Sequence, residues 1–195
     1  MLSYRVSTAT TAGLPPWASR LLFELSAADA RAERIASSLT PQQLNWQPRP
    51  GAWSVGQCLD HLYRGNEVYL PAIAAALEGK PHATTPEIHL SWFSRYFIRN
   101  YIAPNPEVRA KAPKKVEPAA AVDRNILALF LRSNQTARDL VIAAAACDVN
   151  AVRFKNPFIP LLRFTVGTGL EITAKHEARH LLQAENVKAS PNFPQ

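Results

Sequence analysis

Four long stretches of this 195-residue chain place apolar residues at helical spacing, and proline-containing segments separate them. Apolar residues that recur every three or four positions form one stripe along a helix, which is normally buried against neighbouring helices. We expect helices over about 17–39, 54–77, 119–147 and 165–187. The sequence shows no convincing β-hairpin and no internal repeat. The pattern therefore predicts an all-α fold, a four-helix bundle.

Local signals mark where two of these helices begin. Ser54 and Gln57 have the spacing of a capping box, in which each side chain binds a backbone N–H of the other residue. The fourth helix should begin near Thr165 or Thr168, and Thr168 with Glu171 forms a second candidate capping box. A short extra turn is expected over residues 40–46, between the first and second helices.

A long irregular insertion over residues 80–118 separates the second and third helices and contains six prolines. Its aromatic residues should pack over the bundle, because aromatic side chains bury large apolar areas. They are Trp92, Phe93, Tyr96, Phe97 and Tyr101. The insertion also carries much of the basic excess, at Arg95, Arg99, Arg109, Lys111, Lys114 and Lys115. This stretch either connects helices through solvent or faces an anionic partner.

The charge balance and composition narrow the function classes. With 22 Lys and Arg against 15 Asp and Glu, the formal net charge is +7, which is compatible with an anionic partner. No helix-turn-helix or RNA-binding pattern accompanies this charge, which argues against a nucleic-acid partner.

Apolar runs such as 140–147 are far shorter than a membrane span, no secretory signal is visible, and the two cysteines form no CxxC pair. We expect a cytoplasmic, single-domain protein over 1–195, with its core at about 15–188 and no membrane association.

Histidines are the residues most suited to carry chemistry. His176 and His180 lie four positions apart in the sequence HEARH, so both occupy one face of the fourth helix and can bind one metal ion. His61, in the second helix, is the candidate third ligand from a facing helix. The alternative is that these are hydrogen-bonded core histidines. His82 and His89, in the insertion, should be exposed or structural.

HEARH also fits the HExxH pattern of zinc peptidases, in which the glutamate activates water. Only 15 residues follow His180, and they contain no His or Asp to act as a third ligand. No strand pattern precedes the helix to hold an extended peptide. The sequence therefore disfavours a peptidase.

Three segments in order resemble the DinB-like (DinB/YfiT) superfamily. They are LTPQQLNWQPRPGAWSVGQCLDHL, KAPKKVEP and NPFIPLLRFTVGTGLEITAKHEARHLLQAENV, which together span most of residues 38–187. The resemblance implies a four-helix bundle of up-down-down-up type with a divalent metal held by His61, His176 and His180. Some members of this superfamily are metal-dependent thiol transferases that use a small cellular thiol such as bacillithiol or mycothiol, and others have no established activity. A homodimer is a further expectation from the resemblance.

Three histidine ligands leave a coordination position for water or substrate, which is typical of a catalytic metal. Such an ion can lower the pKa of a bound thiol or water. We therefore expect a metal-dependent thiol S-transferase or hydrolase acting on a small molecule, with zinc or nickel favoured and iron or manganese as alternatives. The competing expectation is a metal-binding stress or sensor protein without turnover.

Neighbours of the three histidines are candidates for supporting roles. Gln183 could orient a ligand or be a core amide, and Cys58 could face the site, although packing is the simpler role. Arg179 could bind a substrate carboxylate or form a surface ion pair. Glu177 lies about 100° around the helix from the histidine face, so we expect it to be a surface partner for a Lys or Arg. Asp60 should face solvent.

Overall fold

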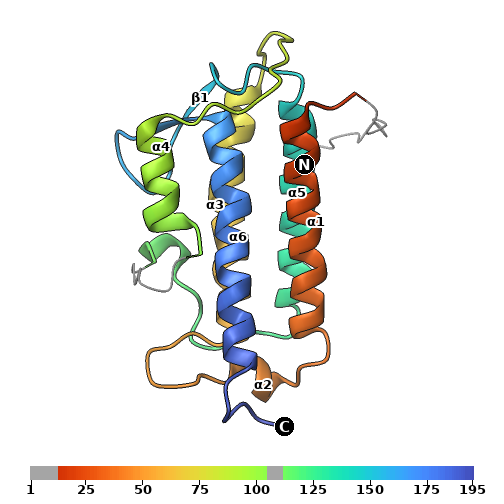
Figure 1. Cartoon of the computed structure of the whole chain (residues 1–195). Helices are drawn as coiled ribbons and strands as arrows, with labels where there is room; N and C mark the ends of the chain where they lie inside the picture. Colours follow the sequence, from red (N-terminus) through yellow and green to blue (C-terminus); the bar gives the residue numbers. More distant parts are fainter. Residues whose placement is uncertain (1–12, 105–111) are drawn as a thin grey trace.

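The computed structural model describes residues 13–104 and 112–195, and most of them are helical (Figure 1). Four long helices form the predicted bundle. They are α1 (Pro16–Ala36), α3 (Val55–Leu77), α5 (Ile126–Ala144) and α6 (Val166–Lys188). The short helix α2 (Pro41–Asn45) is the extra turn expected after the first helix.

The order of the helices requires one long return of the chain. In the view of Figure 1, α1 runs downward, α3 and α5 both run upward, and α6 runs downward. Helices α1 and α3 each pack against both α5 and α6, so α1 and α3 stand on one diagonal of the bundle. Because α3 and α5 are parallel, the chain between them must travel back along the whole bundle. The insertion makes this return.

Part of the insertion is folded into short helical turns along the side of the bundle formed by α3 and α6 (Figure 1). They are α4 (Trp92–Phe97), the π-helical turn η1 (Ile98–Ile102) and the 3-10 turn η2 (Lys114–Val116). Ile98 is buried, and the Phe97 ring lies 5.3 Å from that of Phe164 between centroids. Trp92, Phe93, Tyr96 and Tyr101 remain 43–72% exposed. The expected aromatic packing therefore holds for one face of the segment only.

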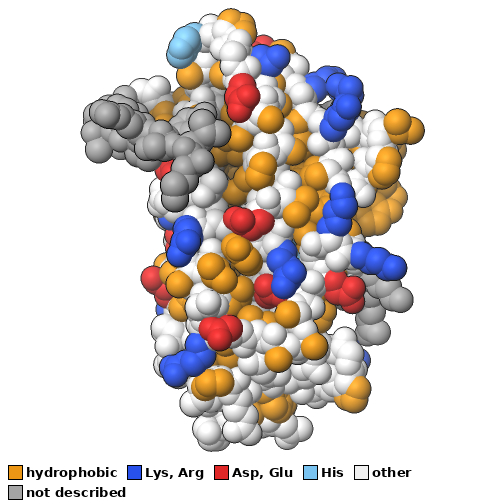
Figure 2. All heavy atoms as spheres, turned by 180° about the vertical axis from the view of Figure 1, so that it is seen from behind, with side chains coloured by type: hydrophobic (Ala, Val, Ile, Leu, Met, Phe, Trp, Pro, Cys, Tyr) orange, Lys and Arg blue, Asp and Glu red, His pale blue; other side chains and the backbone are white. Residues whose placement is uncertain are grey.

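The basic residues of the insertion face solvent wherever the structure describes them. Arg95, Arg99, Lys114 and Lys115 are exposed, and Arg109 and Lys111 lie outside the described residues. Across the rear face of the bundle, acidic and basic side chains are interspersed with hydrophobic ones, and hydrophobic side chains gather toward the edge that carries α4 (Figure 2). None of the described helices is both long and apolar enough to cross a bilayer.

The segment 148–164 contains a small hairpin, so the expectation of no hairpin is wrong. Strands β1 (Arg153–Lys155) and β2 (Arg163–Thr165) pair antiparallel with Phe154 opposite Phe164, and both rings are buried. With three residues each, the strands are too short to show an alternating pattern. Gly169 of α6 makes room for the hairpin, because a Cβ there would lie only 2.7 Å from the Phe154 ring.

Helix α5 begins later than predicted, because side chains of other elements hold the backbone of residues 119–122. The Asp60 carboxylate accepts a hydrogen bond from the Ala119 N–H at 2.8 Å, and the Gln57 amide donates to the Ala119 carbonyl at 3.0 Å. The Val122 N–H donates to the Asn45 side chain at 2.7 Å. These bonds hold the segment in a non-helical conformation until the helix starts.

The caps at the starts of α3 and α6 differ in how well the sequence predicted them. At α3 the capping box is confirmed: the Gln57 N–H donates to Ser54 Oγ at 3.1 Å, and the Ser54 N–H donates to Gln57 Oε1 at 3.0 Å. At α6 the N-cap is Thr165, whose hydroxyl accepts from the Thr168 N–H at 3.2 Å. The second capping box is therefore wrong, and Glu171 forms an ion pair with α1 instead.

The interior of the bundle divides into two apolar clusters with a polar layer between them. The upper cluster contains Leu21, Ile73 and Val141, and the lower one contains Ile35, Leu62, Phe130 and Leu181. Each long helix contributes to the polar layer. Its members are Asp29, Asn66, Ser133, Asn134 and Glu177.

Candidate metal centre

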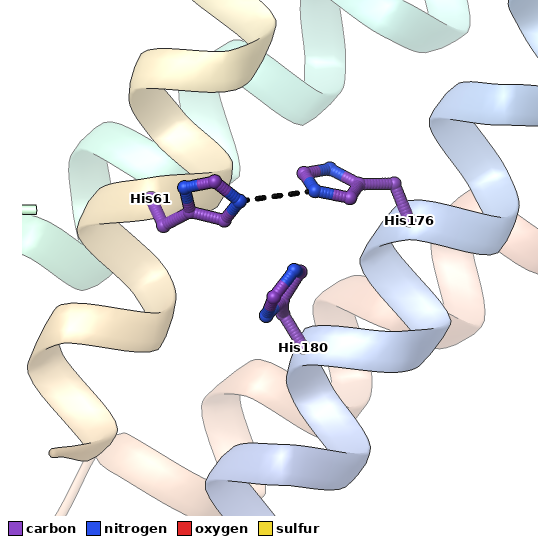
Figure 3. A group of neighbouring side chains, drawn as sticks. All are labelled: His61, His176 and His180. Carbon is purple, nitrogen blue, oxygen red and sulfur yellow. Dashed lines mark hydrogen bonds between the residues drawn. The ribbon is translucent and has the colours of Figure 1, made fainter. Parts of the chain in front are cut away.

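Three histidine side chains converge at the seam between α3 and α6. His61 of α3 points toward His176 and His180 of α6, and the His61 and His176 Nε2 atoms are 3.0 Å apart (Figure 3). The three rings have centroid distances of 4.5–4.9 Å and meet edge to face. One nitrogen from each ring lies within 4.8 Å of the others. The structure thus brings together all three histidines that the sequence singled out.

Helical spacing places two of these side chains side by side. Residues four apart share a face of α6, so His176 and His180 present their rings one turn apart to the neighbouring α3. Gly65 lies one turn after His61 on α3. A Cβ at Gly65 would lie 3.6 Å from the His176 ring, an ordinary contact distance, so α3 passes close beside that ring.

Hydrogen bonds fix which ring nitrogens point into the cluster. His61 Nδ1 lies 2.8 Å from the Val116 carbonyl oxygen, which can only accept, so Nδ1 carries the hydrogen and Nε2 has its lone pair free. His180 Nδ1 likewise donates to Gln183 Oε1 at 2.9 Å. Partners of this kind orient metal-binding histidines and set their tautomer.

The surroundings of the cluster keep the three rings neutral. Burial lowers the pKa of His61, and burial together with the two neighbouring imidazoles holds the pKa of His176 well below its ordinary value. Burial lowers the pKa of His180 to about 3. Neutral imidazole is the form that binds metal, so all three rings are ready to act as ligands at pH 7.

This donor set fits a divalent transition metal. Zinc binds histidine nitrogen at about 2.0–2.1 Å, so three nitrogens around one ion must lie a few ångströms apart, as they do here. Imidazole donors suit zinc, copper, iron and nickel better than magnesium or calcium, which prefer oxygen. The residues present therefore fit the group that the resemblance implies.

Comparison with known proteins places the chain in a family. The model of the DinB superfamily matches residues 24–184. The chain belongs to the DinB superfamily. A solved structure of YfiT from Bacillus subtilis, described as a probable metal-dependent hydrolase with an unusual four-helix bundle topology, matches this DinB-superfamily chain with a TM-score of 0.57 and 16% identity. The match covers 95% of this chain and 91% of YfiT, and it supports the fold. No curated protein matches the sequence.

In this DinB-superfamily chain, the histidine cluster lies at the side of the bundle, where the insertion covers it. The Trp53 ring lies 4.8 Å from the His61 ring and 5.5 Å from the His180 ring, between centroids. The η2 turn supplies the Val116 carbonyl that holds His61. Residues before α3 and within the insertion therefore form the wall of the site. The sequence pattern did not single out Val116, because a backbone carbonyl leaves no signal in the residue type.

The three candidate supporting residues have different surroundings. Gln183 is half-buried and holds His180, as described above. Arg179 Nη1 donates to the Ala103 carbonyl at 3.0 Å, which ties α6 to the insertion. Cys58 is buried in the lower apolar cluster, and burial raises the pKa of its thiol. His82 and His89 are exposed, as expected.

Two predictions about acidic neighbours are wrong. Asp60 is only 5% exposed, and its carboxylate accepts hydrogen bonds from Arg64 and from the Ala119 N–H, both at 2.8 Å. Glu177 is 0% exposed, accepts from Asn66 Nδ2 at 3.2 Å, and has its pKa raised to about 8 by burial. The histidine face of α6 turns toward the insertion, so a rotation of about 100° leads into the bundle core rather than to solvent.

Proposed function

We propose that this chain binds one divalent metal ion through the Nε2 atoms of His61, His176 and His180. One observation carries the proposal: acceptors hold the outer Nδ1–H groups of His61 and His180, so the inner Nε2 atoms of these two rings carry lone pairs that converge with the His176 ring. A core built only for packing has no need of three neutral imidazoles in this arrangement. Zinc or nickel is the favoured ion, with iron or manganese as alternatives.

We further propose that the site carries out thiol S-transfer or hydrolysis on a small molecule. A bound ion would lower the pKa of a thiol or water at the site, which makes it a nucleophile at neutral pH. The protein's own residues orient the ligands and limit access: Gln183 holds His180, and the Trp53 ring covers the His61 and His180 rings on one side.

The positive charge of Arg179 would stabilise an anionic nucleophile beside the three histidines. Its guanidinium lies near enough to the three histidines to disfavour their protonation, which lowers the pKa of each ring. The same positive charge favours a thiolate or hydroxide in the site over the neutral thiol or water. In this proposal the partners are a small thiol and an electrophile, and the chain acts as a homodimer.

The transferase proposal is tested with a fluorogenic electrophile, monochlorobimane, and a panel of small thiols that includes bacillithiol, mycothiol and cysteine. In the reaction a sulfur–carbon bond forms, the carbon–chlorine bond breaks, and the thiol proton and chloride leave to solvent. We expect a rate above the uncatalysed background that is lost on chelation and restored by zinc or nickel. His61→Ala should abolish it, and His82→Ala, an exposed histidine outside the site, should not.

A parallel assay with p-nitrophenyl acetate tests hydrolysis. Turnover that is equal in wild type and His61→Ala would contradict catalysis at this site. Stoichiometric metal binding with neither reaction above background would also contradict it, and would favour a metal-binding stress or sensor protein instead.

A further inference from the structure

A cavity with polar and apolar walls lies at the N-terminal end of α6, away from the histidines. It has a volume of about 450 Å³ and is bordered by the hairpin, α4 and the first turn of α6. Thr168 in its wall precedes His176 by eight residues, which corresponds to about 12 Å along the helix at 1.5 Å per residue. The cavity is therefore separate from the candidate metal centre.

Two arginines give this cavity a positive charge. Arg153 and Arg163 occupy exposed positions of the two strands, next to the buried Phe154 and Phe164, and both arginines border the cavity. No Asp or Glu is among the described residues that border the cavity. Neither arginine forms an ion pair with a described acidic residue. The positive charge of the wall is therefore not neutralised by the described part of the chain.

A chain of four hydroxyl groups adds a hydrogen-bond donor to the same wall. Ser91 and Ser94 are linked at 2.9 Å, Thr168 and Ser94 at 3.2 Å, and Thr165 and Thr168 at 2.9 Å, all between side-chain oxygens. Three links use three of the four hydroxyl hydrogens. The fourth hydroxyl hydrogen has no acceptor among the described residues. Two members of the chain, Ser94 and Thr168, are buried, with exposed fractions of 4% and 1%. A buried donor without an acceptor is costly, so the wall is suited to a ligand that accepts.

The remaining walls are apolar and firmly held. The Phe93 ring stacks on the buried Phe164 ring with centroids 6.2 Å apart, and both border the cavity. The Asn150 side chain holds residues 87–89 in place beside these rings. It accepts a hydrogen bond from the His89 N–H at 2.8 Å and donates one to the Glu87 carbonyl at 2.9 Å. Ligand pockets commonly combine such an apolar wall with a few placed polar groups.

We propose that this cavity binds the oxyanion group of a small molecule, a phosphate or a carboxylate, whose apolar part rests on Phe93. Arg153 and Arg163 supply the opposite charge, and guanidinium groups match the geometry of phosphate and carboxylate oxygens. The hydroxyl chain, through Ser94, donates one further hydrogen bond. Because the cavity stands apart from the histidines, this binding does not depend on the function proposed for them.

The test is calorimetric titration of phenyl phosphate into the full-length protein at low ionic strength. We expect saturable one-site binding that weakens at least tenfold in Arg153→Ala/Arg163→Ala and weakens with added salt. The matched control is Arg124→Ala, an exposed arginine outside the cavity, which should leave the affinity within twofold of wild type. Inorganic phosphate and phenol should each bind more weakly than phenyl phosphate, and a benzoate titration decides between phosphate and carboxylate as the preferred group.

A second variant separates this cavity from the histidine cluster. His176→Ala/His180→Ala should retain phenyl phosphate binding, because no histidine of the cluster borders the cavity. Loss of binding in that variant would mean that the anion sits on a metal ion at the histidines and would overturn the proposal. So would absence of binding to wild type, or equal binding to wild type and the double arginine variant in protein with an unchanged circular dichroism spectrum.

Discussion

His176 and Glu177 are neighbours in the chain, but α6 turns their side chains toward different surroundings. His176 faces α3 and the insertion, within the histidine cluster (Figure 3). Glu177 faces the centre of the bundle, in the polar layer between the two apolar clusters. His176 is half-buried and Glu177 is fully buried, yet each has a strongly shifted pKa, and desolvation is the main cause of both shifts.

The two regions differ in how their polar atoms are arranged. In the histidine cluster, the outer nitrogens of His61 and His180 are bonded, and the inner nitrogens converge. In the polar layer, Asn66 donates to Ser133 and to Glu177, but Glu177 Oε2 and Asn134 Oδ1 have no hydrogen-bond partner. Convergent nitrogen lone pairs suit a metal ion, whereas the two oxygens lie within a core that helix packing encloses. A shifted pKa alone therefore does not distinguish a functional site from a structural polar layer, and the arrangement of the donor and acceptor atoms does.

The largest effect should come from removing the Glu177 side chain. Glu177→Ala leaves a cavity in the core, and we expect the free energy of unfolding to fall by about 3 kcal/mol in urea denaturation. The variant should still bind one metal ion per chain, because the histidine face lies about 100° around α6 from Glu177 and has its own hydrogen-bond partners. Loss of metal without loss of stability would break the distinction between the two regions.

Gln183→Ala should have the next largest effect, and on the histidine cluster alone. Removing the acceptor for the His180 Nδ1–H should weaken zinc binding by about 10–100-fold, which competition with a chelator measures. Asn186→Ala, an exposed amide on the same helix, is the control and should bind zinc as tightly as wild type. Equal affinities in the two variants would show that Gln183 does not orient His180.

Glu177→Gln should change stability less than Glu177→Ala does. The glutamine amide keeps the oxygen that accepts a hydrogen bond from Asn66. In place of the unpartnered Oε2 it carries an NH2 donor, and the same polar layer contains an unpartnered acceptor, Asn134 Oδ1. We expect the free energy of unfolding at pH 7 to lie within about 1 kcal/mol of wild type. A loss as large as that of the alanine variant would show that the layer requires a carboxyl group.

Cys58→Ala should have the smallest effect on the histidine cluster. Cys58 lies one turn before His61 on α3, but its thiol packs in the lower apolar cluster. We expect unchanged zinc affinity and, in the folded wild type, little reaction of this thiol with an alkylating reagent, because burial raises its pKa. Rapid alkylation that zinc prevents would place Cys58 in the site after all.

Local spacing made some features of this fold predictable from the sequence. The Ser54–Gln57 capping box depends on residues three apart, and the pairing of His176 with His180 depends on one turn of helix. His61 was a candidate third ligand because facing helices of a bundle can build one site, and the family resemblance supported it, since no local pattern determines which helices become neighbours.

Features that depend on distant segments were not predictable. Glu177 and Asp60 seemed free to face solvent, and only the position of the insertion decides which side of each helix is covered. The start of α5 depends on bonds from Asp60 and Asn45 to a segment more than 50 residues further along the chain. The short hairpin depends on Gly169, which lets Phe154 approach α6.

The most direct test of the account is a titration of metal-stripped protein with zinc in the presence of a competing chelator, on wild type and on His61→Ala. The account predicts one tightly bound ion per wild-type chain, and no tight binding in His61→Ala despite an unchanged helical circular dichroism spectrum. A wild type that takes up no zinc or nickel, or a His61→Ala variant that binds as tightly as wild type, would contradict the three-histidine metal centre.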